Sequence, residues 1–114
     1  MWILTSIGFF SVVQKPRDSF LTIRSRVKSD LDRLRKGYMP QLSEITTSGG
    51  TDYPYRATIS HEEFARGIAK LIKDIRYTNF KNEVLRKMGS QREQTYSKVW
   101  HTLQELEGLT NETR

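Results

Sequence analysis

The sequence contains no cysteine, which excludes disulfide bonds, thiolate zinc sites and cysteine nucleophiles. A chain without cysteine is compatible with a reducing compartment, and we expect a cytoplasmic protein. The most apolar segment, residues 1–13, is too short to span a membrane, has no basic start and is interrupted by Thr5, Ser6 and Ser11. We therefore predict no membrane partner and interpret this segment as a buried strand.

Motifs for metals, cofactors and catalysis are also lacking. The two histidines, His61 and His101, share no ligand spacing with each other or with acidic residues, and a metal site needs three or four convergent ligands. Gly49-Gly50 is followed by neither a Lys-Ser/Thr pair nor a helix start, so it does not match a phosphate-binding loop. We expect no metal and no cofactor, and a binding protein rather than an enzyme.

What the chain does have is enough length and aromatic side chains for one core. Its 114 residues fit a single domain, and its two Trp, five Tyr and five Phe can fill a small core without a disulfide or metal. We predict one α+β domain over residues 1–107 and a frayed tail over residues 108–114.

Helix starts are marked by Ser-x-x-acid patterns at Ser29, Ser60 and Ser90, in which the serine accepts a hydrogen bond from a free backbone N–H group. Apolar residues at helical spacing follow each pattern. Helices are predicted over residues 30–36, 61–76 and 91–107, with a shorter helix after Asn79.

Strands are predicted over residues 8–14, 20–26, 44–48 and 53–59, which are rich in apolar residues or alternate between apolar and polar ones. The order is then ββαββααα, an α+β fold with a four-stranded antiparallel sheet backed by helices. One arrangement is a circularly permuted ferredoxin-like sheet, with the predicted strands in spatial order 1-2-4-3. The alternative is a plain four-stranded meander with helices on one side.

Positive charge is concentrated in one segment. The net charge is +6, and residues 15–36 hold eight basic residues against three acidic ones, a local charge of +5. Such a segment is typical of a solvated surface, and also of a surface that binds nucleic acid or an acidic partner.

Three arginines are predicted to gather on one face of the sheet. Arg24 and Arg26 lie on the polar face of one predicted strand, and Arg56 lies on the polar face of its predicted neighbour. Phe20 projects the same way and offers a ring for stacking. Guanidinium groups bind phosphate and aromatic rings stack on unpaired bases, so this face is a candidate site for nucleic acid or another anion. The alternative is an ordinary solvated face, or one covered by the C-terminal helices.

A second candidate site lies at the hairpin Thr51-Asp52-Tyr53-Pro54-Tyr55-Arg56. Asp52, Tyr53 and Tyr55 can form a small polar site there, which is the basis for an alternative function as a small enzyme or ligand-binding protein. In the other interpretation Asp52 is a turn residue and the tyrosines, predicted on the same strand face, belong to the core.

The last predicted helix carries an apolar stripe that is either core or a surface for a protein partner. Tyr96 and Trp100 are the candidate anchors of a partner surface, including one for a homodimer.

Several segments together resemble a family of short bacterial proteins with no established activity. The resemblance rests on Phe9-Phe10-Ser11-Val12-Val13-Gln14, on Thr51-Asp52-Tyr53-Pro54-Tyr55-Arg56, on Tyr77-Thr78-Asn79-Phe80-Lys81 and on Tyr96 with Val99-Trp100. It covers residues 8–106 and implies a bacterial intracellular protein, without transferring any catalytic residue.

Overall fold

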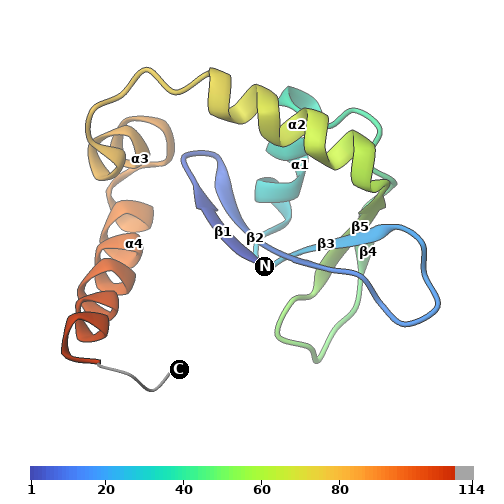
Figure 1. The fold of residues 1–114 in the computed structure, drawn as a ribbon, viewed down its shortest axis with the longest axis horizontal. Coiled ribbons are helices and arrows are strands. Elements are labelled where there is room, and N and C mark those ends of the chain that lie inside the picture. The colour runs from blue at the N-terminus through green and yellow to red at the C-terminus, as the bar shows by residue number, and fades with distance from the viewer. Residues whose placement is uncertain (110–114) are drawn as a thin grey trace. The chain divides into compact units, whose positions relative to one another are not determined.

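The computed structural model describes residues 1–109 (Figure 1). By its internal contacts the chain divides into a sheet unit, Met1–Arg76, and a helical unit that begins at Tyr77. The sheet unit contains β1 (Trp2–Thr5), β2 (Gly8–Val13), β3 (Leu21–Ser25), α1 (Lys28–Gly37), β4 (Thr46–Thr47), β5 (Tyr55–Ile59) and α2 (His61–Lys73). The helical unit contains α3 (Phe80–Met88), α4 (Ser90–Leu103) and the 3-10 helix η1 (Gln104–Gly108). The interpretation of residues 1–107 as one domain stays a prediction.

The sheet is antiparallel and has the order β1-β2-β3-β5-β4. Its last four strands have the spatial order predicted from the sequence. The prediction of four strands is wrong, because the first thirteen residues form a hairpin rather than one buried strand. The Thr5 hydroxyl accepts hydrogen bonds from the backbone of Ile7 and Gly8 at 3.2 and 3.1 Å, and so closes the turn that separates β1 from β2.

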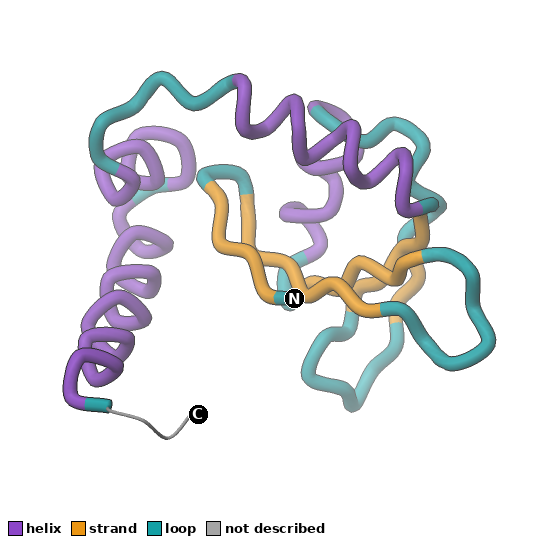
Figure 2. The backbone as a smooth tube through the Cα atoms, viewed as in Figure 1, coloured by secondary structure: helices purple, strands orange, loops and turns teal. Residues whose placement is uncertain are grey.

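The ferredoxin-like arrangement is not confirmed. The sheet has an additional edge strand, β1, and β4 comprises only two residues. Figure 2 shows the long loops that join β2 to β3 and β4 to β5. Strand β5 begins at Tyr55, two residues later than predicted, after Pro54.

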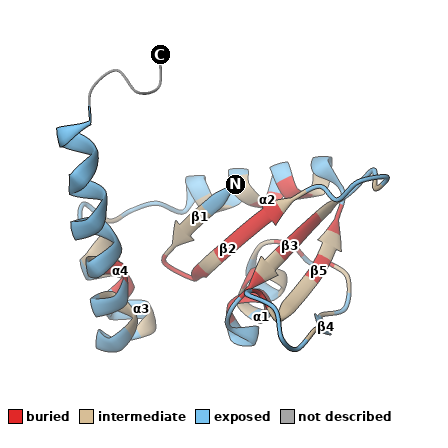
Figure 3. Cartoon of the chain, turned by 90° about the horizontal axis from the view of Figure 1, so that it is seen from below, coloured by how far each residue is buried: buried red, intermediate tan, exposed pale blue. Residues whose placement is uncertain are grey.

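The core of the sheet unit lies between one face of the sheet and the helices α1 and α2, which are on the same side of it (Figure 1). Buried residues follow β2, β3 and β5 (Figure 3). Period-two alternation turns every second side chain of a strand to this side. The fully buried side chains include Phe10, Ile23, Leu31 and Leu34.

Only some of the observed helix starts agree with the caps predicted from the sequence. Ser60 caps α2, since its hydroxyl accepts from the Glu63 N–H at 3.1 Å, and Asn79 caps α3. The predicted caps Ser29 and Ser90 are wrong, because α1 and α4 begin earlier and both serines lie inside the helices.

The helical unit is a pair of helices joined at Gly89. Tyr96 of α4 stacks on Phe80 of α3 with 5.9 Å between ring centroids and 9° between the ring planes. The predicted helix over residues 91–107 is α4 followed by η1. Of the predicted tail, residues 110–114 lie outside the described residues.

Gly67 allows α2 to approach the segment that follows α1. A Cβ atom at position 67 would lie 2.7 Å from the Met39 Cε atom and 3.1 Å from the Tyr38 carbonyl oxygen. Met39 is fully buried, so its side chain has little room to move. Only glycine permits this distance between the two segments.

Replacing Gly67 by alanine is therefore expected to lower the free energy of unfolding by about 1–3 kcal/mol, as overpacking of a core does. Gly37→Ala is the matched control, because Gly37 is also helical and a Cβ atom there meets nothing within 4 Å. Chemical denaturation measures both variants. An equal change in both would show that the approach of α2 does not depend on Gly67.

Tyr38 links the end of α1 to the end of α2. Its hydroxyl donates to Asp74 Oδ2 at 2.8 Å, and Lys70 Nζ lies 5.3 Å from the ring centroid. Burial, then the hydrogen bond to Asp74 and the charge of Asp74, raise the pKa of Tyr38 from 10.0 to about 12. The folded protein thus holds the Tyr38 proton more tightly than the unfolded chain does.

This raised pKa predicts a stabilising contribution that is complete below pH 10 and lost as the pH rises towards about 12. Ultraviolet absorbance during alkaline titration measures ionisation of the tyrosines. Asp74→Asn is expected to lower the pKa of Tyr38, and Tyr38→Phe identifies its signal. An unchanged titration in Asp74→Asn would contradict the role of that carboxylate.

Candidate functional site

The side of the sheet opposite α1 and α2 carries a row of aligned side chains. The strand register places Trp2 opposite Ser11, Ser11 opposite Arg24, and Arg24 opposite Arg56. Residues that are directly opposite in neighbouring strands point to the same side. We call this side of the sheet the arginine face.

Three arginines converge on the short segment before β5. The Arg24 and Arg26 guanidinium carbons lie 4.7 and 4.9 Å from the centroid of the Tyr53 ring. The Arg26 side chain donates to the Asp52 carbonyl at 3.0 Å, and Arg56 Nε donates to the Tyr53 carbonyl at 3.2 Å. These three residues, Arg24, Arg26 and Arg56, form the arginine cluster predicted from the sequence.

The arginine cluster differs from two basic residues of α1 in its partners. Arg33 pairs with Asp30, and Lys28 pairs with Asp32 at 3.2 Å. Within residues 1–109, no carboxylate lies within ion-pair distance of any member of the cluster. Its members contact carbonyl and hydroxyl oxygens and an aromatic ring. The positive charge on β3 and β5 is therefore not neutralised by ion pairs.

Arg24 is held in a fixed position on the arginine face. It donates to Ser11 Oγ at 2.8 Å, while its Nε atom is buried and has no acceptor among the described residues. The Ser11 hydroxyl and the Tyr53 ring hold the guanidinium group in place. A side chain ordered in this way loses less conformational entropy when it binds an anion.

An aromatic row continues from the arginine cluster to the edge of the sheet. The Tyr53 ring lies 6.5 Å from the Phe9 ring, and the Phe9 ring lies 6.1 Å from the Trp2 ring in an edge-to-face arrangement. Trp2 is 71% exposed, whereas Tyr53 is 7% exposed. Sequence reasoning missed Trp2 and Phe9 as members of this surface, because it interpreted residues 1–13 as one strand. The polar pair Thr5-Ser6 was the available signal for a turn in that segment.

One sequence prediction about aromatic residues needs correction, and another stays a prediction. Phe20 lies just before β3 and makes no ring or cation–π contact in the described part of the chain, so its role as a stacking surface stays a prediction. Tyr53 and Tyr55 were predicted on one face. Tyr55 instead lies opposite Ser25 and packs against the core, while Tyr53 lies on the arginine face.

The difference between the tyrosines arises because β5 begins only at Tyr55. Tyr53 precedes the strand and does not follow its alternation, so the arginine side chains determine its position. The alternative site of Asp52, Tyr53 and Tyr55 stays a prediction, but its two rings lie on opposite sides of the sheet.

The predicted partner residues of α4 differ in exposure. Tyr96 is 5% exposed and stacks on Phe80, so it is an internal residue of the structure. Trp100 is 48% exposed, and Lys81 Nζ lies 4.4 Å from its ring centroid. Partner binding through α4 stays a prediction.

The described residues offer neither a metal site nor a membrane-spanning helix. No group of three or more His, Asp or Glu side chains there is placed to hold a metal ion. None of the described helices combines the length and the apolar character needed to cross a bilayer. No family model, curated protein or solved structure matches the chain.

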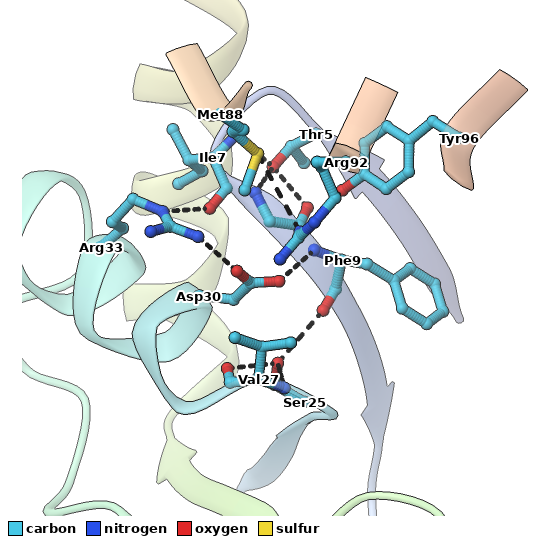
Figure 4. Close-up of polar contacts among 11 residues, drawn as sticks. Thr5, Ile7, Phe9, Ser25, Val27, Asp30, Arg33, Met88, Arg92 and Tyr96 are labelled. Atoms are coloured by element: carbon cyan, nitrogen blue, oxygen red, sulfur yellow. Dashed lines mark hydrogen bonds and ion pairs between the residues drawn. The ribbon is translucent and has the colours of Figure 1, made fainter. Parts of the chain in front are cut away.

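A separate buried polar cluster surrounds Asp30 (Figure 4). Its carboxylate is almost fully buried, accepts from the Phe9 N–H at 3.0 Å and pairs with Arg33, whose Nε donates to the Ile7 carbonyl at 2.8 Å. Gly8 makes this approach possible, because a Cβ atom there would lie 2.7 Å from the Asp30 side chain. The cluster joins the first turn of α1 to the hairpin of β1 and β2, which is a structural role.

Asp30→Ala is expected to lower the free energy of unfolding by about 3 kcal/mol, because it leaves the Phe9 N–H without its acceptor and the Arg33 guanidinium without its carboxylate partner. The matched control is Asp32→Ala in the same helix, whose ion pair with Lys28 is exposed and should contribute less than about 1 kcal/mol. Urea denaturation compares the variants. Similar losses for both would contradict the structural role of Asp30.

Proposed function

We propose that the protein is a non-enzymatic binding domain whose arginine face binds nucleic acid. The observation that carries this proposal is the arginine cluster, in which three guanidinium groups lie together without a carboxylate partner in the described residues. Guanidinium groups bind phosphate oxygens with paired hydrogen bonds. A cluster of them therefore favours a ligand with repeated negative charges.

Aromatic rings beside the arginine cluster favour nucleic acid over other polyanions. Phe9, Tyr53 and Trp2 form a continuous row that ends next to the guanidinium groups. Bases have planar faces that stack on such rings, whereas the side chains of an acidic peptide have none. A phosphate backbone and its bases thus match both features of the face.

The order of β2 to β5 supports a finer structural proposal, namely that these strands and the helices between them form a circularly permuted ferredoxin-like sheet. RNA-recognition modules also bind single strands on the face of a four-stranded sheet. We further propose the bacterial origin implied by the sequence resemblance and a cytoplasmic location, which accords with the lack of cysteine.

The test is a fluorescence anisotropy titration of a labelled oligothymidylate and a labelled oligouridylate at two salt concentrations. The double variant Arg24→Ala/Arg56→Ala should weaken binding about 10- to 100-fold, because it removes two charged hydrogen-bond donors. The slope of log affinity against log salt should also become less steep by about 1.4, which corresponds to two phosphate contacts on a single strand. Thermal unfolding checks that the variants fold. If the Arg24 side chain proves necessary for folding, Arg26→Ala takes the place of Arg24→Ala in the double variant.

The matched control is Arg66→Ala/Lys73→Ala, which removes the same charge from α2 on the other side of the sheet. It should leave affinity nearly unchanged. An equal loss in both double variants would show that only net charge matters. Binding of polyglutamate as tightly as the oligonucleotides would identify a general anion site, and the nucleic-acid function would then be wrong.

A further inference from the structure

We infer that the arginine face selects single-stranded over duplex nucleic acid, because a base of the bound strand stacks on Trp2. This inference rests on the proposed function and names the ligand class of the same site. Its basis is the position of an exposed indole ring at the end of an aromatic row that begins at the arginine cluster.

The exposure of Trp2 distinguishes it from the other aromatic residues of the row. Tyr53 is covered and contacts Arg24 and Arg26, and Phe9 is half-buried between Tyr53 and Trp2. Trp2 alone among them is largely exposed, at 71%. A large apolar ring with that exposure, on the same side of the sheet as the arginine cluster, is suited to a base that has left its own stack.

The backbone holds the Trp2 ring in a defined place. Strand β1 pairs with β2 from Trp2 to Thr5, and the pairing extends one residue further, since Val12 N–H donates to the Met1 carbonyl at 2.8 Å. The edge of the Phe9 ring supports the indole from the sheet side. An ordered aromatic ring loses little conformational entropy when a base stacks on it.

The spacing of the strands sets the size of the bound segment. Trp2 lies on β1, two strands away from Arg24 on β3 and three strands away from Arg56 on β5. At about 4.8 Å between strands, the ring and the guanidinium groups span about 10–14 Å. That span fits two or three nucleotides, the number that sheet-face RNA modules stack. In a duplex the base faces are covered by neighbouring pairs, so Trp2 would have nothing to stack on.

The experiment uses the full chain with Trp100→Phe, which leaves Trp2 as the only tryptophan. Intrinsic fluorescence and anisotropy of a labelled strand are recorded in the same titration. Four probes of equal length are compared: oligothymidylate, oligouridylate, an abasic phosphodeoxyribose strand and a DNA duplex. The two base-containing single strands should quench Trp2, while the abasic strand and the duplex should bind more weakly and leave its fluorescence unchanged.

Trp2→Ala in the wild-type chain should weaken binding of the base-containing strands about 5- to 150-fold, the range for loss of one stacked base. It should leave binding of the abasic strand unchanged, and Trp2→Phe should retain part of the affinity. Anisotropy that reports binding without quenching of Trp2, or an undiminished affinity in Trp2→Ala, would overturn the inference and leave the proposed function intact. Absence of binding by every probe would overturn the proposed function itself.

Discussion

The covering of one face of the sheet by α1 and α2 is the constraint on which the rest of the structure depends. Strand side chains alternate, so once Phe10 and Ile23 point into the core, Ser11 and Arg24 must point to the other side. The antiparallel register then aligns Arg24 with Arg56 across β3 and β5. The grouping of positive charge is thus a consequence of how the apolar side chains are buried.

The paired charges of α1 and the arginine cluster differ in the partners that surround them. In α1 the basic side chains of Arg33 and Lys28 have acidic partners one turn away, and the buried carboxylate of Asp30 helps to hold the helix against the hairpin. An extended strand does not bring residues three or four positions apart together as a helix does. The arginines of the cluster contact the Tyr53 ring and backbone carbonyls instead. Arg33 and Lys28 are thus paired within their helix, whereas the arginine cluster has no carboxylate partner in the described residues.

Tyr53 connects the architecture to the proposed site. Its ring contacts Arg24 and Arg26, and its carbonyl accepts from Arg56, so a single residue before β5 orders all three guanidinium groups. Cation–π contacts of this kind keep arginines close together although they carry like charge. Through Phe9 the same ring extends the site towards Trp2. The aromatic row therefore both organises the charges and supplies the surface on which a base can stack.

Local patterns in the sequence determined the fold class, the cap at Ser60 and the placement of Arg24 and Arg56 on the polar faces of their strands, because alternation and capping act over a few residues. They left two strand orders open. They did not reveal the hairpin at Thr5, the separation of Tyr53 from Tyr55 or the position of Trp2 beside Phe9. Each of these depends on where a strand starts or ends. Strand ends are decided by contacts with distant residues, such as the arginines that hold Tyr53 and the β2 partners that pair with β1. The sequence by itself thus determined which side chains alternate, and only the tertiary structure decided which of them meet.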